Sequence, residues 1–188
     1  MMWLCVGVLL WMVVHFIPSV APGLRATLVK HVGENPYKGI FALTLVLFIV
    51  LMVIGWRSTT PEIIYVPPAW APPLTSMLML IAVLLFGAAH QPTRIRKFIR
   101  HPQLTGMVVW SLSHLLANGD SRSLVLFGGL GLWALIEMPL ISRREGAWAR
   151  PYGPALSVEI RSILISVVIF FVLFFLHPYF AGVSPIPR

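Results

Sequence analysis

Residues 39–56 read GIFALTLVLFIVLMVIGW and contain no charged side chain. An α-helix needs about 20 apolar residues to cross the ~30 Å hydrocarbon layer of a membrane, and about 17 can suffice. A stretch of this length and composition is typical of a membrane-spanning helix and is too apolar for the surface of a soluble domain. It therefore predicts an integral membrane protein.

Five further stretches approach the same length: residues 1–17, 74–90, 104–117, 124–141 and 163–180, and the first of them either ends near Ile17 or continues past Pro18 towards Arg25. The stretch 104–117 is short and carries several polar side chains, so whether it crosses the membrane fully is left open. We expect protein or a cofactor around it rather than lipid. The sequence predicts an all-α membrane bundle of five or six transmembrane helices, in a single domain over residues 1–188.

The composition of the whole chain supports a membrane protein. Among 188 residues, 58% are hydrophobic and 11% are charged, and the mean hydropathy is +0.87. Soluble domains carry about 25% charged residues, so an ordinary water-soluble enzyme is excluded, and so is a disordered chain. A single cysteine, Cys5, excludes a disulfide scaffold.

The net charge of +8 is distributed over alternate loops. Eleven of the 14 basic residues follow the first, third and fifth stretches: Arg25, Lys30, Lys38, Arg94, Arg96, Lys97, Arg100, Arg143, Arg144, Arg150 and Arg161. The positive-inside rule predicts that these loops are cytoplasmic and that both termini lie outside. The basic loops would then face anionic membrane lipids. No nucleic acid is expected as a partner, because no motif for reading it is present.

Two histidines inside the predicted spans are candidate ligands. Ionisable residues are costly within a membrane, so each one is a candidate functional residue. His15 lies about 15 Å along a helix from Arg25, and His114 lies about 21 Å from Arg100, at 1.5 Å per residue. If both arginines mark one interface and the first helix continues beyond Pro18, the histidines reach similar depths. They could then provide both axial ligands of a haem b; the alternative is two histidines hydrogen-bonded within the bundle.

Other polar residues around these histidines extend the candidate site. One predicted face of the span 104–117 carries Gln103, Gly106, Trp110, His114 and Ala117 at three- or four-residue spacing. The basic residues Arg94, Arg96, Lys97 and Arg100 could neutralise haem propionates or simply face lipid. Glu137 lies inside the fifth span and needs a partner or a proton, and we expect Arg100 or His101 to approach it.

Motifs of other enzyme classes are missing. The sequence contains no CxxCH, which excludes covalently attached c-type haem. It contains no GxSxG, no Walker loop, no GxGxxG and no HExxH. These absences leave both a non-covalently bound haem b and a pair of hydrogen-bonded histidines open.

The central segment resembles a known family. Residues 100–120 read RHPQLTGMVVWSLSHLLANGD and continue with SLVLFGG at 123–129, which resembles the signature of NnrU proteins. His15 after an apolar start and GENPYKG at 33–39 resemble the same family, so the similarity extends over about residues 1–180. The resemblance implies a multi-pass protein of the bacterial inner membrane, in a family linked by name to nitrite and nitric oxide metabolism in denitrifiers.

The NnrU family is in turn similar to the 15-cis-zeta-carotene isomerases of plants and cyanobacteria, in which two histidines ligate a haem b. By position, those histidines match His15 and His114. The resemblance implies haem b iron bound by this pair, with Arg100, Gln103 and Trp110 at the cofactor site. It also implies that one ligand is displaced on reduction and that the partner is an apolar polyene or nitric oxide.

Three functions remain open at this point. The first is a redox-gated isomerase of an apolar polyene such as a cis-carotenoid, with a lipid-open pocket beside the haem. The second is a haem-based sensor or electron-transfer module in nitrite or nitric oxide metabolism, without such a pocket. The third is a methyltransferase similar to the isoprenylcysteine carboxyl methyltransferases, whose Arg-His-Pro-like motif belongs to an S-adenosylmethionine site and is matched by residues 100–106, with Glu145 and Tyr152-Gly153 as weaker matches.

Overall fold

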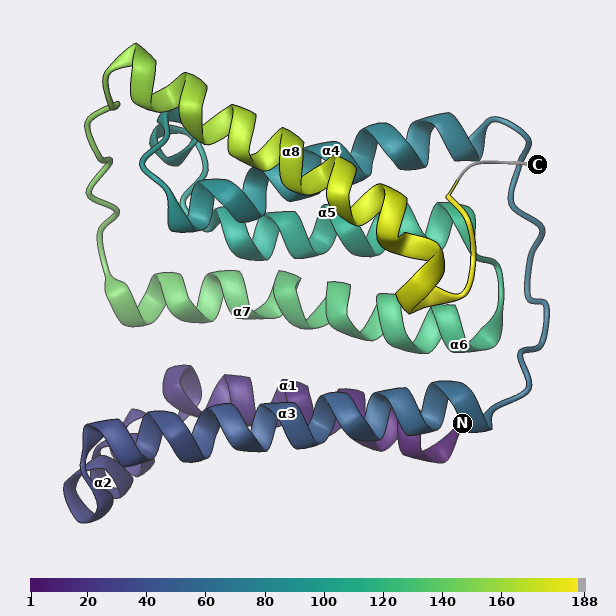
Figure 1. Cartoon of the computed structure of the whole chain (residues 1–188). Helices are drawn as coiled ribbons and strands as arrows, with labels where there is room; N and C mark the ends of the chain where they lie inside the picture. The colour runs from purple at the N-terminus through teal and green to yellow at the C-terminus, as the bar shows by residue number, and fades with distance from the viewer. Residues whose placement is uncertain (186–188) are drawn as a thin grey trace.

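The computed structural model describes residues 1–185, which form a bundle of antiparallel helices (Figure 1). The elements are α1 (Met2–Val20), α2 (Pro22–Val32), α3 (Glu34–Ser58), α4 (Ala71–His90), η1 (Arg94–Lys97), α5 (Pro102–Ala117), α6 (Ser121–Ser123), η2 (Leu124–Gly128), α7 (Gly129–Glu145) and α8 (Leu156–Ala181). Five helical segments are long and apolar enough to cross a membrane: α1, α3, α4, α8 and the continuous segment Ser121–Glu145. The predicted all-α membrane fold is confirmed.

The short helix α5 lies inside the bundle, where it packs between α4 and α7. It has 16 residues and is therefore shorter than the five candidate spans. Its buried residues include Gly106, which faces α4, and Ser111, against which Gly131 of α7 packs. The prediction that protein or a cofactor, rather than lipid, surrounds this segment is confirmed only in part, because α4 and α7 cover two sides of α5 while Leu112 is 54% exposed.

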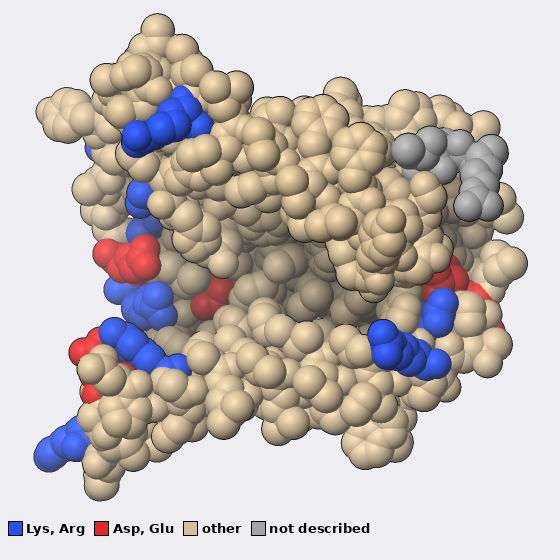
Figure 2. All heavy atoms as spheres, viewed as in Figure 1, with Lys and Arg blue, Asp and Glu red and all other residues tan. Residues whose placement is uncertain are grey.

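The polar groups gather at the two ends of the bundle. The N-terminus and the end of α8 lie at one end, whereas α2 and the basic segment around η1 lie at the other (Figure 1). Figure 2 shows Lys and Arg side chains near both ends and a broad band between them that is almost free of charge. This band is the part that hydrocarbon would surround.

The core lies between α1, α5 and α7. One buried cluster joins Leu4 and Val8 of α1 to Met52 of α3 and Leu130 of α7. A second cluster contains Leu104 of α5 with Trp133 and Ala134 of α7, and Trp11 of α1 packs against both clusters. Close contact of α1 with α3 depends on Gly55, because a Cβ there would overlap the backbone of Leu4. Small residues allow such close approach of helices in membranes.

The first helix does not reach Arg25. It continues through Pro18 but ends at Val20, and Ala21 takes φ −126° and ψ 61° before α2 begins at Pro22. Proline lacks an N–H donor and keeps the preceding residue out of helical geometry. The continuation of the first span to Arg25 as one helix is therefore wrong, and Arg25 belongs to α2 at the end of the bundle (Figure 1).

Candidate functional site

The imidazole of His114 is fixed near the end of α5. Its Nδ1 lies 2.9 Å from the carbonyl oxygen of Trp110. A carbonyl only accepts hydrogen bonds, so Nδ1 must donate, and the neutral ring keeps its lone pair on Nε2. The ring stacks on Phe127 with centroids 4.4 Å apart and lies 4.7 Å from the Trp110 ring.

His15 has the same local arrangement on α1. Its Nδ1 lies 2.8 Å from the carbonyl oxygen of Trp11, which again leaves the lone pair on Nε2. The ring lies 4.4 Å from Trp11, 4.7 Å from Trp133 and 5.7 Å from Phe41. An imidazole held through Nδ1 by a carbonyl, with Nε2 available, is the usual form of a metal-ligating histidine. Both predicted ligands therefore have the chemistry that a metal requires.

Both imidazoles contact aromatic residues of the same helical segment, Ser121–Glu145, but at different heights. His15 touches Trp133 and His114 touches Phe127, six residues earlier in the segment that includes α7 and about 9 Å away along a helix axis. The similar depth expected from Arg25 and Arg100 is thus not reproduced. The histidine beside His114 is His177 of α8, at a centroid distance of 6.5 Å. Sequence spacing gave no signal for that contact.

A hollow runs along the surface of the molecule. Figure 2 shows it between α8 on one side and α1 and α3 on the other, with α7 between them in Figure 1. His114 approaches α8 at His177, and His15 approaches α3 at Phe41. The two predicted ligands therefore contact helices on opposite sides of this hollow.

The contact of His114 with Phe127 depends on a π-helical turn that the sequence analysis missed. Residues Leu124–Gly128 form the π-helix η2, between α6 and α7. Such turns are rare and occur often at functional sites. Phe127 in this turn also contacts Trp110 at 4.9 Å and Trp56 at 6.2 Å. Phe127 thus connects the α7 segment to α3 and α5 beside His114.

A polar cluster closes the end of the bundle beside this turn. Asp120 accepts hydrogen bonds from the amides of Arg122 and Ser123 and from the Ser123 hydroxyl, at 3.0, 3.1 and 2.6 Å. Burial alone would raise the pKa of Asp120, but these hydrogen bonds and the Arg122 charge hold it below its usual value. Arg122 donates to the carbonyls of Trp56 and Thr59. The pattern of Asp followed by Ser three residues later is an N-cap signal that sequence analysis could have found.

The remaining predicted cofactor residues lie towards opposite ends of α5. Trp110 lies beside His114, whereas Arg100 and Gln103 lie at the opposite, basic end of that helix. The Arg100 guanidinium donates to the Gly146 carbonyl at 2.8 Å and lies 3.8 Å from the carboxylate of Glu145. Gln103 is exposed. In this structure Arg100 therefore fixes the end of α7.

Glu137 has a different partner from the one predicted. The Ser19 hydroxyl donates to its Oε1 at 2.8 Å, and Arg144 donates to Ser19 Oγ at 3.3 Å. Arg100 and His101 instead contact the segment around Ser142, so the pairing of either with Glu137 is wrong. Glu137 is only 4% exposed, and its Oε2 is buried without a hydrogen-bond partner among the described residues.

The contact between His101 and α7 makes stability depend on pH. His101 Nε2 lies 2.7 Å from Ser142 Oγ. Burial lowers the pKa of His101, the Arg100 charge lowers it further, and Glu145 opposes them. Because the pKa is lower in the folded than in the unfolded state, the stabilisation is complete above about pH 6.5 and is lost as the pH falls through the folded pKa.

We therefore expect the melting temperature in detergent to be lower at about pH 5.5 than at about pH 7.5. His101→Gln should reduce this difference, because the amide does not titrate. An unchanged difference in the variant would show that other groups cause the pH dependence.

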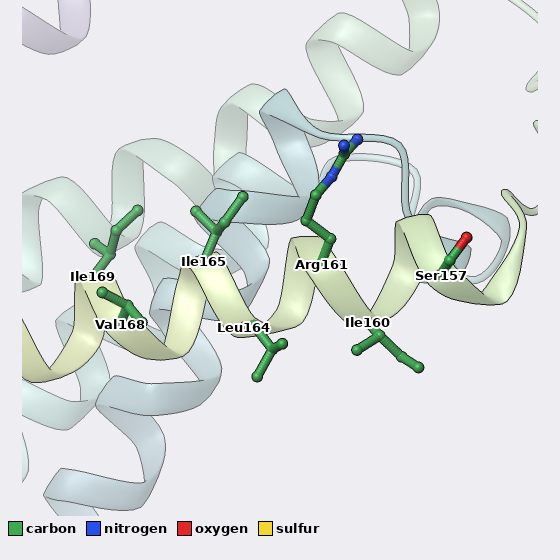
Figure 3. A pocket seen from close by; sticks show the side chains of 7 residues that line it. All are labelled: Ser157, Ile160, Arg161, Leu164, Ile165, Val168 and Ile169. Atoms are coloured by element: carbon green, nitrogen blue, oxygen red, sulfur yellow. The ribbon is translucent and has the colours of Figure 1, made fainter.

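An open, mostly apolar surface lies along α8 (Figure 3). Every residue that lines it, from Ser157 to Ile169, belongs to this one helix. Most of these side chains are apolar, with Arg161 and Ser157 as the polar ones. An exposed apolar surface on a single helix is suited to contact with lipid chains.

Comparisons with known proteins give one result that covers almost the whole chain. No curated protein and no solved structure matches significantly. The family described as NnrU protein matches residues 3–185, which include all of α1 but its first residue, the π-helical turn and the two predicted ligands. The chain therefore belongs to the NnrU family.

Proposed function

We propose that this membrane protein of the NnrU family binds one haem b through His15 and His114 and acts as a redox-gated cis–trans isomerase of an apolar polyene such as a cis-carotenoid. The observation that carries the proposal is the pair of imidazoles that are each fixed through Nδ1 and have Nε2 available. The proposed location is a bacterial inner membrane, with the basic end of the bundle in the cytoplasm.

The surrounding residues fit a flat apolar group. Four aromatic residues, Trp11, Trp110, Phe127 and Trp133, lie within 5 Å of one or other imidazole, measured between ring centroids. Imidazole is a common axial ligand of haem iron, and helix bundles hold cofactors between facing helices. The hollow between α8 and α1–α3 would admit a hydrocarbon substrate from the side (Figure 2).

The roles of the residues follow from this arrangement. His15 and His114 would hold the group, the Trp11 and Trp110 carbonyls would keep both rings in the tautomer that can bind a metal, and the aromatic side chains would exclude water. Bound haem supplies a redox-active iron that can act as a Lewis acid on a polyene or bind nitric oxide. Arg100 and Gln103 would contact only those parts of the bound group that extend towards the basic end of the bundle.

One observation favours the alternative of a sensor or electron-transfer module. His177 has its Nδ1 2.8 Å from the Val183 carbonyl, so it also has a free Nε2, and it lies 6.5 Å from His114. Two imidazoles that bound one metal ion between them would have ring centres roughly 6 Å apart. His114 and His177 could therefore hold the iron together, and two strong ligands would suit electron transfer better than substrate binding.

The test is an absorption spectrum of the detergent-purified protein, expressed with ample haem and recorded oxidised and then reduced. We expect the sharp bands of haem b, and conversion of a cis-carotenoid by the reduced form only. A colourless protein would contradict the haem proposal. Haem bands with no isomerisation, together with nitric oxide binding, would favour the alternative.

A further inference from the structure

A small cavity lies at the basic end of the bundle, away from the histidines' Nε2 atoms. It has a volume of about 360 Å³ and is lined by Pro18 of α1, Pro22 and Arg25 of α2, and Arg144 of α7. Two of its four lining residues carry a guanidinium group, and none carries a carboxylate. Its wall is therefore positively charged.

The break between α1 and α2 creates this cavity. The turn at Ala21 directs α2 away from the axis of α1 and places Arg25, in the first turn of α2, opposite the last turn of α7. Arg144 is oriented by the Ser19 hydroxyl, which accepts its hydrogen bond at 3.3 Å. Arg25 lies over the Tyr37 ring at 5.7 Å. Both guanidinium groups are thus positioned by neighbouring side chains.

The nearby carboxylates leave room for an anion. Glu145 approaches Arg144 at 3.7 Å, but it is a solvent-exposed neighbour on the same helix, and such pairs are weak. Glu137 is separated from Arg144 by the Ser19 hydroxyl, which donates to the carboxylate. Arg25 has no ion pair among the salt bridges of the described residues. Glu137 interacts electrostatically with Arg144, and Glu34 with Arg25, but neither pair forms a salt bridge among the described residues.

The position of α2 places the cavity at the level of lipid headgroups. None of the eleven residues of α2 is buried. Leu24, Leu28 and Val32 recur every four residues and are 49%, 42% and 43% exposed. A short helix with an exposed apolar face and basic residues, at the end of a transmembrane bundle, is typical of the membrane interface.

We propose that this cavity binds the phosphate group of an anionic phospholipid, held by Arg25 and Arg144. Guanidinium groups bind phosphate oxygens in a forked geometry, and basic pockets between helices on one side of a membrane bind acidic headgroups. The apolar side chains of α2 contact the acyl chains of the same lipid. Binding of the lipid does not require haem, so this proposal and the proposed function can fail separately.

The test is lipid binding to the purified full-length protein in a neutral detergent, by native mass spectrometry and by melting temperature. The probes are dioleoyl phosphatidylglycerol, dioleoyl phosphatidylcholine and inorganic phosphate. We expect phosphatidylglycerol to bind and to raise the melting temperature, and the other two probes to bind at least about tenfold more weakly. Equal binding of the two phospholipids would overturn the proposal. If inorganic phosphate bound as tightly as phosphatidylglycerol, the cavity would be a site for free phosphate and the proposal of a lipid ligand would be wrong.

Matched variants locate the site. Arg25→Gln/Arg144→Gln should weaken phosphatidylglycerol binding by about tenfold or more. Arg143→Gln/Arg57→Gln removes the same charge from exposed residues that do not line the cavity and should leave binding unchanged. Equal affinity in the two double variants would overturn the proposal. If the first does not fold, Arg25→Lys and Arg144→Lys keep the charge and lose the fork, and unchanged affinity in both would also overturn it.

Discussion

Replacing His114 by alanine is expected to remove or shift the absorption bands of the proposed haem b. The substitution removes the imidazole that contacts Phe127 in the π-helical turn and lies next to Trp110. His15→Ala should remove the second proposed ligand. The expected result is a haem that is lost or bound through one histidine, seen as a shifted spectrum in both oxidation states. Absorption spectra and haem-to-protein ratios of the variants measure both effects.

Two further histidines provide the controls. His31 makes the same bond from Nδ1 to the carbonyl four residues earlier, Thr27, at 2.8 Å, but it is exposed on α2. His31→Ala should leave the spectrum unchanged. His177→Ala tests the neighbour of His114, and under the proposed pairing it changes the spectrum less than His15→Ala. The opposite order would move the second ligand from α1 to α8, and a wild-type spectrum in His114→Ala would contradict the site altogether.

Residue patterns were sufficient to predict the all-α fold, because a membrane allows so few backbone structures. Every backbone polar group in hydrocarbon must be bonded internally, so long apolar runs form helices and their number follows from the sequence. The polar side chains of the stretch 104–117 also indicated that protein covers part of α5. Local features such as Pro18 and Pro22 were ambiguous, because proline is tolerated both within a helix and at the first position of the next one.

The contacts of the site could not be predicted, because they depend on residues far apart in the chain. Ser19 reaches Glu137 across 118 residues, and no periodicity encodes that pairing. His177 reaches His114 near the end of α8, where Gly182 takes a positive φ of 76° and the following Val183 carbonyl binds the imidazole. The π-helical turn at Phe127 inserts an extra residue that shifts the helical periodicity, so the spacing of a regular helix does not predict its contacts.

Replacing Gly55 by leucine is expected to destabilise the bundle by about 3 kcal/mol or more. A Cβ at this position overlaps the backbone nitrogen and Cα of Leu4, and backbone atoms cannot move aside as the end of a flexible side chain can. Leu4 is fully buried in the cluster with Val8 and Met52, so separating α1 from α3 would open that cluster. Equilibrium unfolding in mixed detergent micelles measures the change in free energy.

Gly39→Leu is the matched control, because it makes the same substitution in the same helix at a position where a Cβ meets no atom within 4 Å. Leucine favours helix over glycine by up to about 1 kcal/mol, so this variant should be as stable as the wild type or slightly more stable. The difference between the two variants therefore isolates the contact of α1 with α3 from helix propensity. Since α1 carries His15, a loosened α1 in Gly55→Leu should also weaken haem binding, whereas Gly39→Leu should retain it. Equal unfolding free energies in the two variants would show that α1 and α3 do not pack through Gly55.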